Sequence, residues 1–445
     1  MKLWQHDKTA VKEVEKFTVG RDREMDMFLA PFDVLGSLAH ITMLESIGLL
    51  TREELTQLSK ALKRIYADID RGEFSVADGV EDIHSQVEIE LTKLLGDTGK
   101  KIHSGRSRND QVLVDVKLYL RAEIDFMVTE VKNLFDLLIA QSEKHKHYLL
   151  PGYTHFQLAM PSSFGLWFGA YAESLVDDVI TLKAAYEVVN KNPLGSAAGY
   201  GSSFPLNRKL TTQLLGFDDL NYNVVYAQMG RGKTERILAS AISNIAATLS
   251  KLSMDACLFL NQNFAFITFP DELTTGSSIM PHKKNPDVFE LVRGRCNQII
   301  ALPHDISLIA ANLPSGYHRD MQLLKELLFP AIQNLKDCLR MAHLMLTNIH
   351  VKDNILADEK YKYLFSVEEV NKLVLAGVPF RDAYRTVGLS IREGNYQPDA
   401  ALHHVHEGSI GNLCLEEITR NMDNAIRAFG FHRYHQAVSN LLKES

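Results

Sequence analysis

Long stretches without proline or glycine constrain the fold of this chain more than any other feature. Residues 109–150 contain neither residue, and residues 233–269 again lack both. Apolar side chains recur at helical spacing in these stretches, at Val116, Leu120, Ile124, Val131, Leu134 and Leu138 and at Ile237, Ile242, Ile245, Leu249, Leu252, Met254 and Leu258. Helices of about 30 residues reach roughly 45 Å. The pattern therefore predicts an all-α fold with an extended helical bundle.

Two more long helices are expected over residues 287–313 and 320–350. Each contains one proline, Pro303 or Pro330, and a proline inside a helix usually kinks it. Strand signals are sparse along the whole chain. Residues 222–226 are the best strand candidate, and we expect a short extended connection there.

Shorter helices are expected on both sides of the long ones. Thr51 and Glu54 have the spacing of a capping box at the start of a helix, and Ser366 and Glu369 repeat that spacing near the C-terminus. We therefore expect three domains: an N-terminal helical domain over 1–105, a central long-helix domain over 106–352 and a C-terminal helical domain over 353–445.

Charge and cysteine usage limit the partners of the chain. Its 48 basic and 55 acidic side chains give a net charge of −7, which argues against general nucleic-acid binding. The first eight residues lack the apolar core of a signal peptide, and no apolar run approaches the roughly 18 residues of a membrane helix. The four cysteines lie far apart without metal-ligand spacing, as free thiols of a reducing cytoplasm would. We expect a cytoplasmic protein without nucleic-acid or membrane partners.

The segment Gly276-Ser-Ser-Ile-Met-Pro-His-Lys-Lys-Asn-Pro-Asp287 carries the densest chemical information. Small residues let its backbone bend, and a hydroxyl, two lysines and an amide follow within nine positions. Loops of this kind close active sites and exclude water. The alternative is a polar surface turn between two helices.

Two further polar motifs are typical of anion sites. Glu81-Asp-Ile-His84 precedes His103-Ser-Gly-Arg-Ser-Arg-Asn-Asp-Gln111, which suits a turn entering the long helix near residue 110. Backbone N–H groups at a helix start, together with Arg106 and Arg108, attract anions. The alternative is an arginine-capped surface turn.

The two remaining motifs contain a histidine and a pair of neighbouring polar residues. Gly152-Tyr-Thr-His155 contains an imidazole, the usual proton-transfer group, although a lone histidine is more often structural. Gln322 and Lys325 are three residues apart, so they share a helix face and suit a carboxylate. The alternative for this pair is a solvated helix face.

Two motifs resemble known sites without meeting their requirements. Gly230-Arg-Gly-Lys-Thr234 has the end of a P-loop, but Ala227 stands where the first glycine is required. The histidines near the C-terminus, at 403, 404 and 406, have no carboxylate or cysteine at ligand spacing, so we expect surface residues there.

Taken together, these motifs resemble the argininosuccinate lyase branch of the fumarase and aspartase superfamily. The signature Gly-Ser-Ser-x-Met-Pro-x-Lys-x-Asn-Pro is specific for the superfamily. The branch is indicated by His103–Gln111, by Gly152–His155 and by the spacing of Tyr317 from the Gln322 and Lys325 pair. The match extends from Phe17 to the C-terminal region.

This resemblance implies an all-α homotetramer whose central helices form a twenty-helix bundle, with each active site shared by three subunits. The implied reaction is the reversible cleavage of argininosuccinate to arginine and fumarate, the last step of arginine biosynthesis. It requires no metal and no organic cofactor.

The resemblance also implies roles for individual residues. Ser277 and His155 would be the proton-transfer pair, with Glu290 orienting and charge-balancing His155. Lys283 and Asn285 would bind the succinyl carboxylates. Other residues would hold the substrate, namely Ser37, Asn109, Thr154, Tyr317, Gln322 and Lys325, supported by His84, Arg108 and Arg231. Which of Ser277 and His155 is the base stays open.

Three segments depart from the family pattern. Met160 replaces a glutamine, and residues 195–207 and 223–235 differ from the common forms. These differences affect the pocket for the arginine portion more than the elimination chemistry. Two alternatives therefore stay open: adenylosuccinate lyase or another fumarate-releasing lyase, and a non-catalytic crystallin-like homologue.

Overall fold

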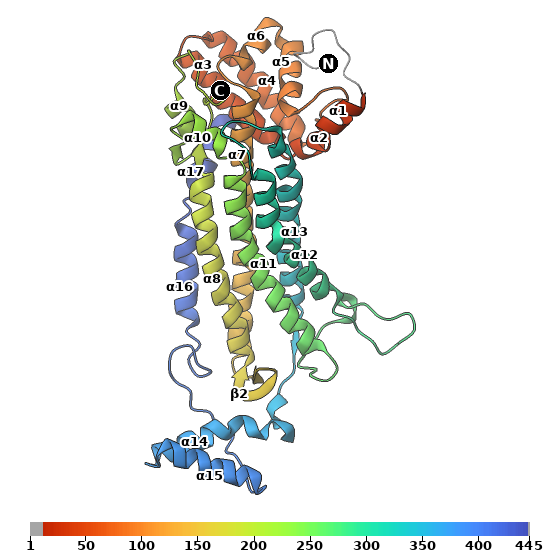
Figure 1. Cartoon of the computed structure of the whole chain (residues 1–445), viewed down its shortest axis with the longest axis vertical. Coiled ribbons are helices and arrows are strands. Elements are labelled where there is room, and N and C mark those ends of the chain that lie inside the picture. The colour runs from red at the N-terminus through yellow and green to blue at the C-terminus, as the bar shows by residue number, and fades with distance from the viewer. Residues whose placement is uncertain (1–11, 444–445) are drawn as a thin grey trace.

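The computed structural model describes residues 12–443, which form an elongated and largely helical molecule (Figure 1). The all-α prediction is confirmed. Five long helices lie along its length: α7 (Arg108–Lys144), α8 (Phe164–Val189), α11 (Lys233–Leu260), α12 (Asp287–Ala310) and α13 (Leu323–Thr347). With 37 residues, α7 spans about 55 Å.

The long helices pack around one continuous apolar core. Residues at helical spacing on α7, α8, α11 and α13 are fully buried there, among them Leu134, Phe135, Val179, Ile245 and Leu335. The apolar faces predicted for residues 109–150 and 233–269 both contribute to this core, although Met254 is exposed. The helices end earlier than predicted, at Lys144 and Leu260, because turns lead from them into short strands.

Shorter helices lie at one end of the bundle (Figure 1). They are α1 (Lys12–Val19), α2 (Asp22–Asp26), α3 (Ala30–Ser46), α4 (Arg52–Asp70), α5 (Ile83–Leu95) and α6 (Asp97–Lys100), followed by the 3₁₀ turn η1 (Lys101–His103). Helices α3, α4 and α5 form a second apolar core there. The capping box predicted for α4 is confirmed, because Thr51 and Glu54 exchange side-chain and backbone hydrogen bonds. The first eight residues, which were considered for a signal peptide, lie outside the described residues.

The chain returns to this end at its C-terminus. Helix α16 (Leu415–Arg427) lies against α8 and α7, and α17 (His432–Leu442) packs on α3 and α9 (Arg208–Leu214). Figure 1 shows the C-terminal end beside the N-terminal helices. The N-terminal core is therefore closed by a helix more than 300 residues away in the chain.

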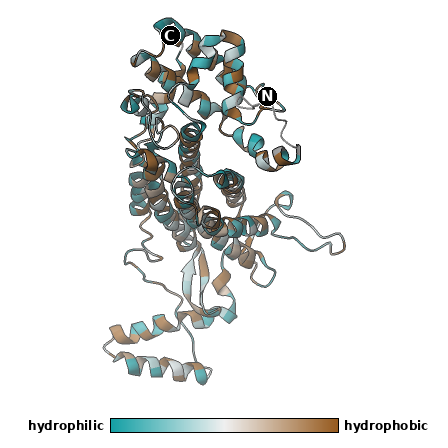
Figure 2. Ribbon diagram, turned by 45° about the horizontal axis from the view of Figure 1, so that its top comes forward, coloured by the Kyte–Doolittle hydropathy of each residue, from teal (hydrophilic) through white to brown (hydrophobic). Residues whose placement is uncertain are grey.

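The opposite end of the bundle carries a β-hairpin and a small helical extension. Strands β1 (Leu149–Thr154) and β2 (Gln157–Ser163) are antiparallel. Below them lie the 3₁₀ turns η4 (Ile355–Ala357) and η5 (Glu359–Phe365) and the helices α14 (Ser366–Leu375) and α15 (Phe380–Arg392). Figure 2 shows hydrophobic and hydrophilic residues interleaved along the helices at both ends of the molecule.

Two local predictions are wrong. Residues 222–226 form neither a strand nor an extended connection, because Asn223, whose own backbone is extended, accepts the amides of Val225 and Tyr226 with its side chain and starts helix α10 (Val224–Met229). Helix α14 begins where predicted but without a capping box. Ser366 already has helical geometry there, since the preceding 3₁₀ turn leads directly into the helix, and no side chain caps it.

The remaining strands are pairs of two residues each. β3 (Lys191–Asn192) is parallel to β4 (Asp219–Leu220), and β5 (Ile267–Thr268) is antiparallel to β6 (His350–Val351). Helix α11 has the length and apolar composition of a membrane span, but half of its most apolar window is buried inside the protein, as in soluble core helices. The three-domain division stays a prediction.

Candidate active site

A cavity of about 610 Å³ lies where the N-terminal helices meet the end of the bundle. Four separate parts of the chain line it: the N-terminal helices, the first turn of α7, the segment before α11 and the loop that leads into α13. Seven predicted substrate-binding residues are among the lining residues, namely His84, Arg108, Asn109, Arg231, Tyr317, Gln322 and Lys325. The structure thus brings together residues up to 241 positions apart in the sequence.

The start of α7 positions two of these residues. Ser107 caps the helix and exchanges hydrogen bonds with Asp110, which confirms the turn predicted before residue 110. Arg108 and Asn109 follow the cap and face the cavity. The Arg108 guanidinium lies 3.1 Å from the Glu81 carboxylate and 3.0 Å from that of Asp82. These two carboxylates therefore orient the guanidinium and balance its positive charge.

Lys325 is buried in the cavity wall, with 4% of its surface exposed. Its ammonium lies 2.5 Å from Asp22 and 2.6 Å from Asp26. Burial alone would lower the pKa of Lys325, but Asp26 and Asp22 outweigh it and raise the pKa above the ordinary value. Burial in turn raises the pKa of Asp22, and the Lys325 charge opposes this. The alternative of a solvated helix face is wrong for Lys325.

The residues beside Lys325 are fixed by backbone contacts. Gln322 in the 3₁₀ turn η3 (Arg319–Gln322) donates its amide to the carbonyls of Thr18 and Val19, at 3.2 and 3.0 Å. Tyr317 lies on the preceding loop and is partly exposed. These contacts hold the segment before α2 against the start of α13, so the N-terminal helices form one wall of the cavity.

Arg231 reaches the cavity from the segment that resembles a P-loop. It donates to the Glu235 carboxylate at 2.7 Å and to the Met321 carbonyl at 2.8 Å. The Gly232 amide also donates to Glu235, at 2.7 Å. The Glu235 carboxylate thus accepts an N–H group at the start of α11 that a P-loop would offer to phosphate. This segment therefore does not form a phosphate site, and Arg231 lines the cavity instead.

Ser37 does not belong to the cavity lining. It is buried within α3, where its hydroxyl accepts a hydrogen bond from Arg106 at 3.0 Å. Its predicted contact with substrate stays a prediction.

Thr154 and His155 lie at the tip of the β1–β2 hairpin, at the other end of the bundle (Figure 1). The two-residue turn consists of His155 and Phe156, with φ angles of +55° and +58°. Two positive φ angles define a type I′ turn, which favours asparagine and glycine. Non-glycine residues are strained there, and such strain often occurs at functional sites. The side chains of this tip are exposed.

Ser277, Lys283 and Asn285 lie in a loop that projects from the side of the molecule ahead of α12 (Figure 1). The Asn285 amide donates to the Thr275 carbonyl at 2.8 Å and closes the base of the loop. The Ser277 hydroxyl accepts the amides of Ile279 and Met280, at 3.3 and 3.1 Å. The loop therefore directs two backbone N–H groups at the predicted proton-transfer oxygen.

Glu290 is exposed on the first turns of α12. Apart from Ser37, the predicted residues of one chain thus fall into three groups: the cavity, the hairpin tip, and the loop with the start of α12. Among residues 12–443, no hydrogen bond or ion pair joins His155 to Ser277 or to Glu290. The roles predicted for these groups stay predictions.

Sequence reasoning left several lining residues without a role. They are chiefly acidic or basic: Asp22, Asp26, Glu81, Asp82, Glu88, His103 and Arg319. The signal for two of them was the acidic pair Glu81-Asp82 in the same motif as His84. Asp22 and Asp26 were harder to find, because only folding places the N-terminal helices against α13.

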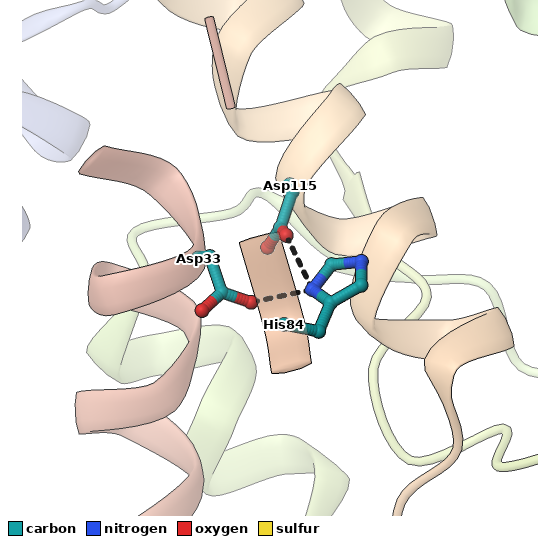
Figure 3. Close-up of side chains that lie close together, drawn as sticks. All are labelled: Asp33, His84 and Asp115. Atoms are coloured by element: carbon teal, nitrogen blue, oxygen red, sulfur yellow. Dashed lines mark hydrogen bonds and ion pairs between the residues drawn. The ribbon is translucent and has the colours of Figure 1, made fainter. Parts of the chain in front are cut away.

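A buried group beside the cavity has the composition of a metal site. Asp33, His84 and Asp115 bring their ligand atoms within 4.8 Å of one another. However, His84 Nδ1 lies 2.7 Å from Asp33 Oδ1, the distance of a direct hydrogen bond. The Arg106 guanidinium supplies positive charge to both carboxylates. The three residues are therefore already paired with one another (Figure 3), and Arg106 balances part of their charge.

The chain is similar to known proteins over most of its length. The family model described as Lyase matches residues 8–301. Relatives named argininosuccinate lyase from Bacteroides fragilis and Parabacteroides distasonis are each 63% identical over 441 residues, covering 99% of this chain and 99% of the relative. A relative of the same name from Thermotoga neapolitana is 39% identical and covers 87% of this chain and 97% of its own length.

Solved structures show the same fold at lower identity. An EDDS lyase in complex with formate has a TM-score of 0.75 at 21% identity, covering 98% of this chain and 94% of its own. A fumarate lyase:delta crystallin from Brucella melitensis bound to cobalt has a TM-score of 0.71 at 18% identity, covering 92% and 95%. At these identities the likeness concerns the fold alone.

Proposed function

The chain belongs to the argininosuccinate lyases of the Lyase family, and on this premise we propose that it cleaves argininosuccinate reversibly to arginine and fumarate. Full-length relatives with that name support the reaction. The observation that carries the proposal in the structure is the cavity, because it gathers seven predicted substrate-binding residues. We place the reaction in arginine biosynthesis in the cytoplasm.

The reaction is an elimination across one carbon–carbon bond of the succinyl group. A base removes the proton next to a carboxylate, and a carbon–carbon double bond forms. The electrons of the carbon–nitrogen bond leave with the guanidine nitrogen, which is protonated by an acid. The carboxylate oxygens carry extra negative charge on the way. Preorganised N–H donors and cations stabilise such charge, each donor contributing about 3 kcal/mol.

Ser277 and His155 are the proposed proton-transfer pair. A serine hydroxyl is a weak base in water, so its alkoxide needs nearby positive charge. The amides of Ile279 and Met280 already donate to Ser277 Oγ, and Lys283 on the same loop adds a cation. His155 carries the second proton transfer, with Glu290 orienting it. General acid–base catalysis of this kind is worth roughly 10²–10⁴-fold.

The carboxylates of the substrate need a separate set of donors. In this proposal Lys283 and Asn285 of the loop bind the succinyl carboxylates, and Thr154 of the hairpin lies beside them. The cavity holds the remainder of the substrate through Asn109, Tyr317, Gln322 and Lys325, with Ser37 as a further candidate. The acidic residues of its wall suit the cationic arginine portion.

The site is assembled from three copies of the chain. One copy supplies the cavity, a second the hairpin tip and a third the Ser277 loop, within a homotetramer whose long helices associate as a twenty-helix bundle. This arrangement explains why one chain holds the three groups apart. Of the three proposed domains, over 1–105, 106–352 and 353–445, the central one carries both the hairpin tip and the Ser277 loop, and the cavity is lined by the first two.

Fumarate absorbance with argininosuccinate as substrate tests the reaction directly. We expect turnover with argininosuccinate and none with adenylosuccinate, and the reverse result would favour the sister enzyme. Ser277→Ala should lower kcat by about 10²–10⁴-fold. An unchanged rate in that variant would contradict the role of Ser277 and favour a non-catalytic homologue.

Mixed tetramers test the sharing of the site. Ser277→Ala and His155→Gln are each expected to be nearly inactive alone. If hairpin and loop come from different subunits, random mixing restores both groups in about a quarter of the sites by the symmetry of the assembly. Mixtures without regained activity would show that one subunit supplies both groups.

A further inference from the structure

Three buried side chains meet just behind the cavity, one from each of three helices (Figure 3). Asp33 comes from α3, His84 from α5 and Asp115 from α7. Their exposed fractions are 2%, 7% and 1%, respectively. The group therefore joins the N-terminal helices to the bundle at a position that water does not reach freely.

Both carboxylates face the same nitrogen of His84. Asp33 Oδ1 lies 2.7 Å and Asp115 Oδ2 lies 3.5 Å from His84 Nδ1. Figure 3 shows the second ring nitrogen, Nε2, on the side of the ring away from both carboxylates. Because His84 also lines the cavity, Nε2 is the nitrogen available to a ligand.

The two carboxyl groups need a proton between them. Like charges held close together in a dry site do not both ionise. Burial raises the pKa of Asp115 well above its ordinary value, and the charge of Asp33 and a hydrogen bond to it raise it further. Asp33 Oδ2 and Asp115 Oδ2 are buried without a hydrogen-bond donor among residues 12–443. One proton on Asp115 satisfies this arrangement.

We propose that Asp33 and Asp115 share one proton and act as positioning residues, which hold His84 as an imidazolium with its Nε2–H presented to a ligand carboxylate. Asp33 accepts the Nδ1–H and so fixes both the orientation and the charge of the ring. The proposal deepens the function above and rests on it, because argininosuccinate and fumarate both carry carboxylates.

The surroundings of His84 favour the charged ring. Burial works against the imidazolium, but the hydrogen bond and charge of Asp33, with the charges of Asp82 and Asp26, raise the pKa of His84 above its ordinary value. The charged and titratable groups facing this cluster from the packed elements are Asp26, Asp33, Asp82, His103, Arg106, Arg108 and Asp115.

The pH dependence of kcat/KM tests the proposal. The alkaline limb of that profile should contain the loss of the His84 proton. Asp33→Asn removes the carboxylate that holds this proton, so the limb should move to lower pH and kcat/KM should fall about 10–100-fold. Asp115→Asn imitates the protonated acid and should cost less. The proposal would be overturned if the alkaline limb of Asp33→Asn stayed at the wild-type pH. It would also be overturned if Asp115→Asn lowered kcat/KM more than Asp33→Asn does.

A double-mutant cycle separates positioning from a structural effect. His84→Gln keeps an N–H donor but has no imidazolium, so it should lose the His84 limb. Because Asp33 acts through His84, Asp33→Asn should then add almost no further loss to His84→Gln. If the fold-losses in kcat/KM of the two single variants multiplied in the double variant, Asp33 would act independently of His84.

Asp178→Asn is the matched control for the loss of a buried carboxylate. Asp178 is also buried and accepts a hydrogen bond from Thr248, at 2.7 Å, but on the far helices α8 and α11. It should change stability without moving the alkaline limb. A limb that moves equally in this control would assign the shift to general destabilisation.

Succinate binding provides a readout that needs no turnover. Calorimetry on the whole wild-type protein should show succinate affinity falling as pH rises, with the fall displaced to lower pH in Asp33→Asn. If argininosuccinate were not cleaved but this displacement occurred, the proposed function would fail and the positioning pair would stand. If cleavage occurred without the displacement, the positioning pair would fail.

Discussion

Lys325 Nζ lies 2.6 Å from Asp26 Oδ1, so a buried ion pair joins the first turn of α13 to the short helix α2. The two residues are 299 positions apart in the chain. Asp22 binds the same ammonium from the other side. One wall of the cavity therefore depends on a lysine that two carboxylates neutralise.

Lys325→Met should strongly destabilise this wall. The change leaves Asp22 and Asp26 without their buried cation, and removing one partner of a buried pair typically costs about 3–5 kcal/mol. Chemical denaturation measures this loss as a lower free energy of unfolding. Lys284→Met is the control, because the pair of Lys284 with Asp271 is exposed and should cost less than about 1 kcal/mol. Equal losses in both variants would contradict the prediction.

Asp110 anchors a loop that departs from the family pattern. Its Oδ2 accepts the amides of Gly195 and Ala197, at 2.9 and 3.0 Å, while Oδ1 accepts that of Ser107 at 2.8 Å. Asp110→Ala leaves these amides without their partner and should cost about 2–4 kcal/mol. Asp110→Asn keeps one acceptor oxygen and should cost less.

Hydrogen exchange resolves where Asp110 acts. In Asp110→Ala, the amides of residues 195–201 should exchange faster than those in the middle of α7, because only the loop loses its anchor. Uniformly faster exchange along the chain would instead indicate global destabilisation.

Lys117 should make stability depend on pH. It is buried and donates to the carbonyls of Val188 and Lys191, at 3.3 and 3.0 Å, and to the Asn221 side chain at 2.9 Å. Burial lowers the pKa of Lys117 to about 7, opposed by the charge of Glu235.

The sign of this effect follows from the two states. Between pH 7 and about 10 the folded protein has released the Lys117 proton, whereas the unfolded chain keeps it with a pKa near 10.4. Stability therefore rises with pH in this window, by up to about 1.4 kcal/mol per pH unit. In Lys117→Met this slope should vanish from denaturation curves measured between pH 7.5 and 9.5. Lys336→Met, which removes another buried lysine, should leave the slope in place.

The long helices could be predicted from sequence because their signal is local. The apolar spacing on α7 and the cap formed by Ser107 are properties of neighbouring residues, and both occur in the structure. The segment at 222–226 shows the limit of this approach. Its apolar residues favour a strand, but the single side chain of Asn223 satisfies two amides and starts a helix.

The charged motifs indicated part of the cavity lining, whereas segments that only folding joins were not indicated. His84, Arg108 and Asn109 line the cavity, although Glu81 and Asp82 beside them had been given no role. Asp26 was not expected there, because nothing near it in sequence indicates Lys325. The pair formed by Asp33 and Asp115 is hidden for the same reason, since each carboxylate alone resembles any polar residue on a helix.

The turn at the hairpin tip gives a prediction in which stability and activity change in opposite directions. His155 and Phe156 both have positive φ angles, at a strain cost of roughly 1–2 kcal/mol for each non-glycine residue. Phe156→Gly removes one of these costs, so the free energy of unfolding should rise by about 1 kcal/mol. Leu158→Gly, just outside the turn on β2, is the control and should lower it.

The same variant should nevertheless lose activity. Phe156 is 86% exposed in the isolated chain, as the proposed entry of the tip into the site of another subunit requires. Without the ring, and with a freer backbone beside it, His155 is no longer held in one geometry, and a displacement of about 1 Å can cost 10²-fold in rate. Thermal denaturation and fumarate release on the same preparation measure both effects. A variant that gains stability and keeps full kcat would show that the strain at His155 has no part in catalysis.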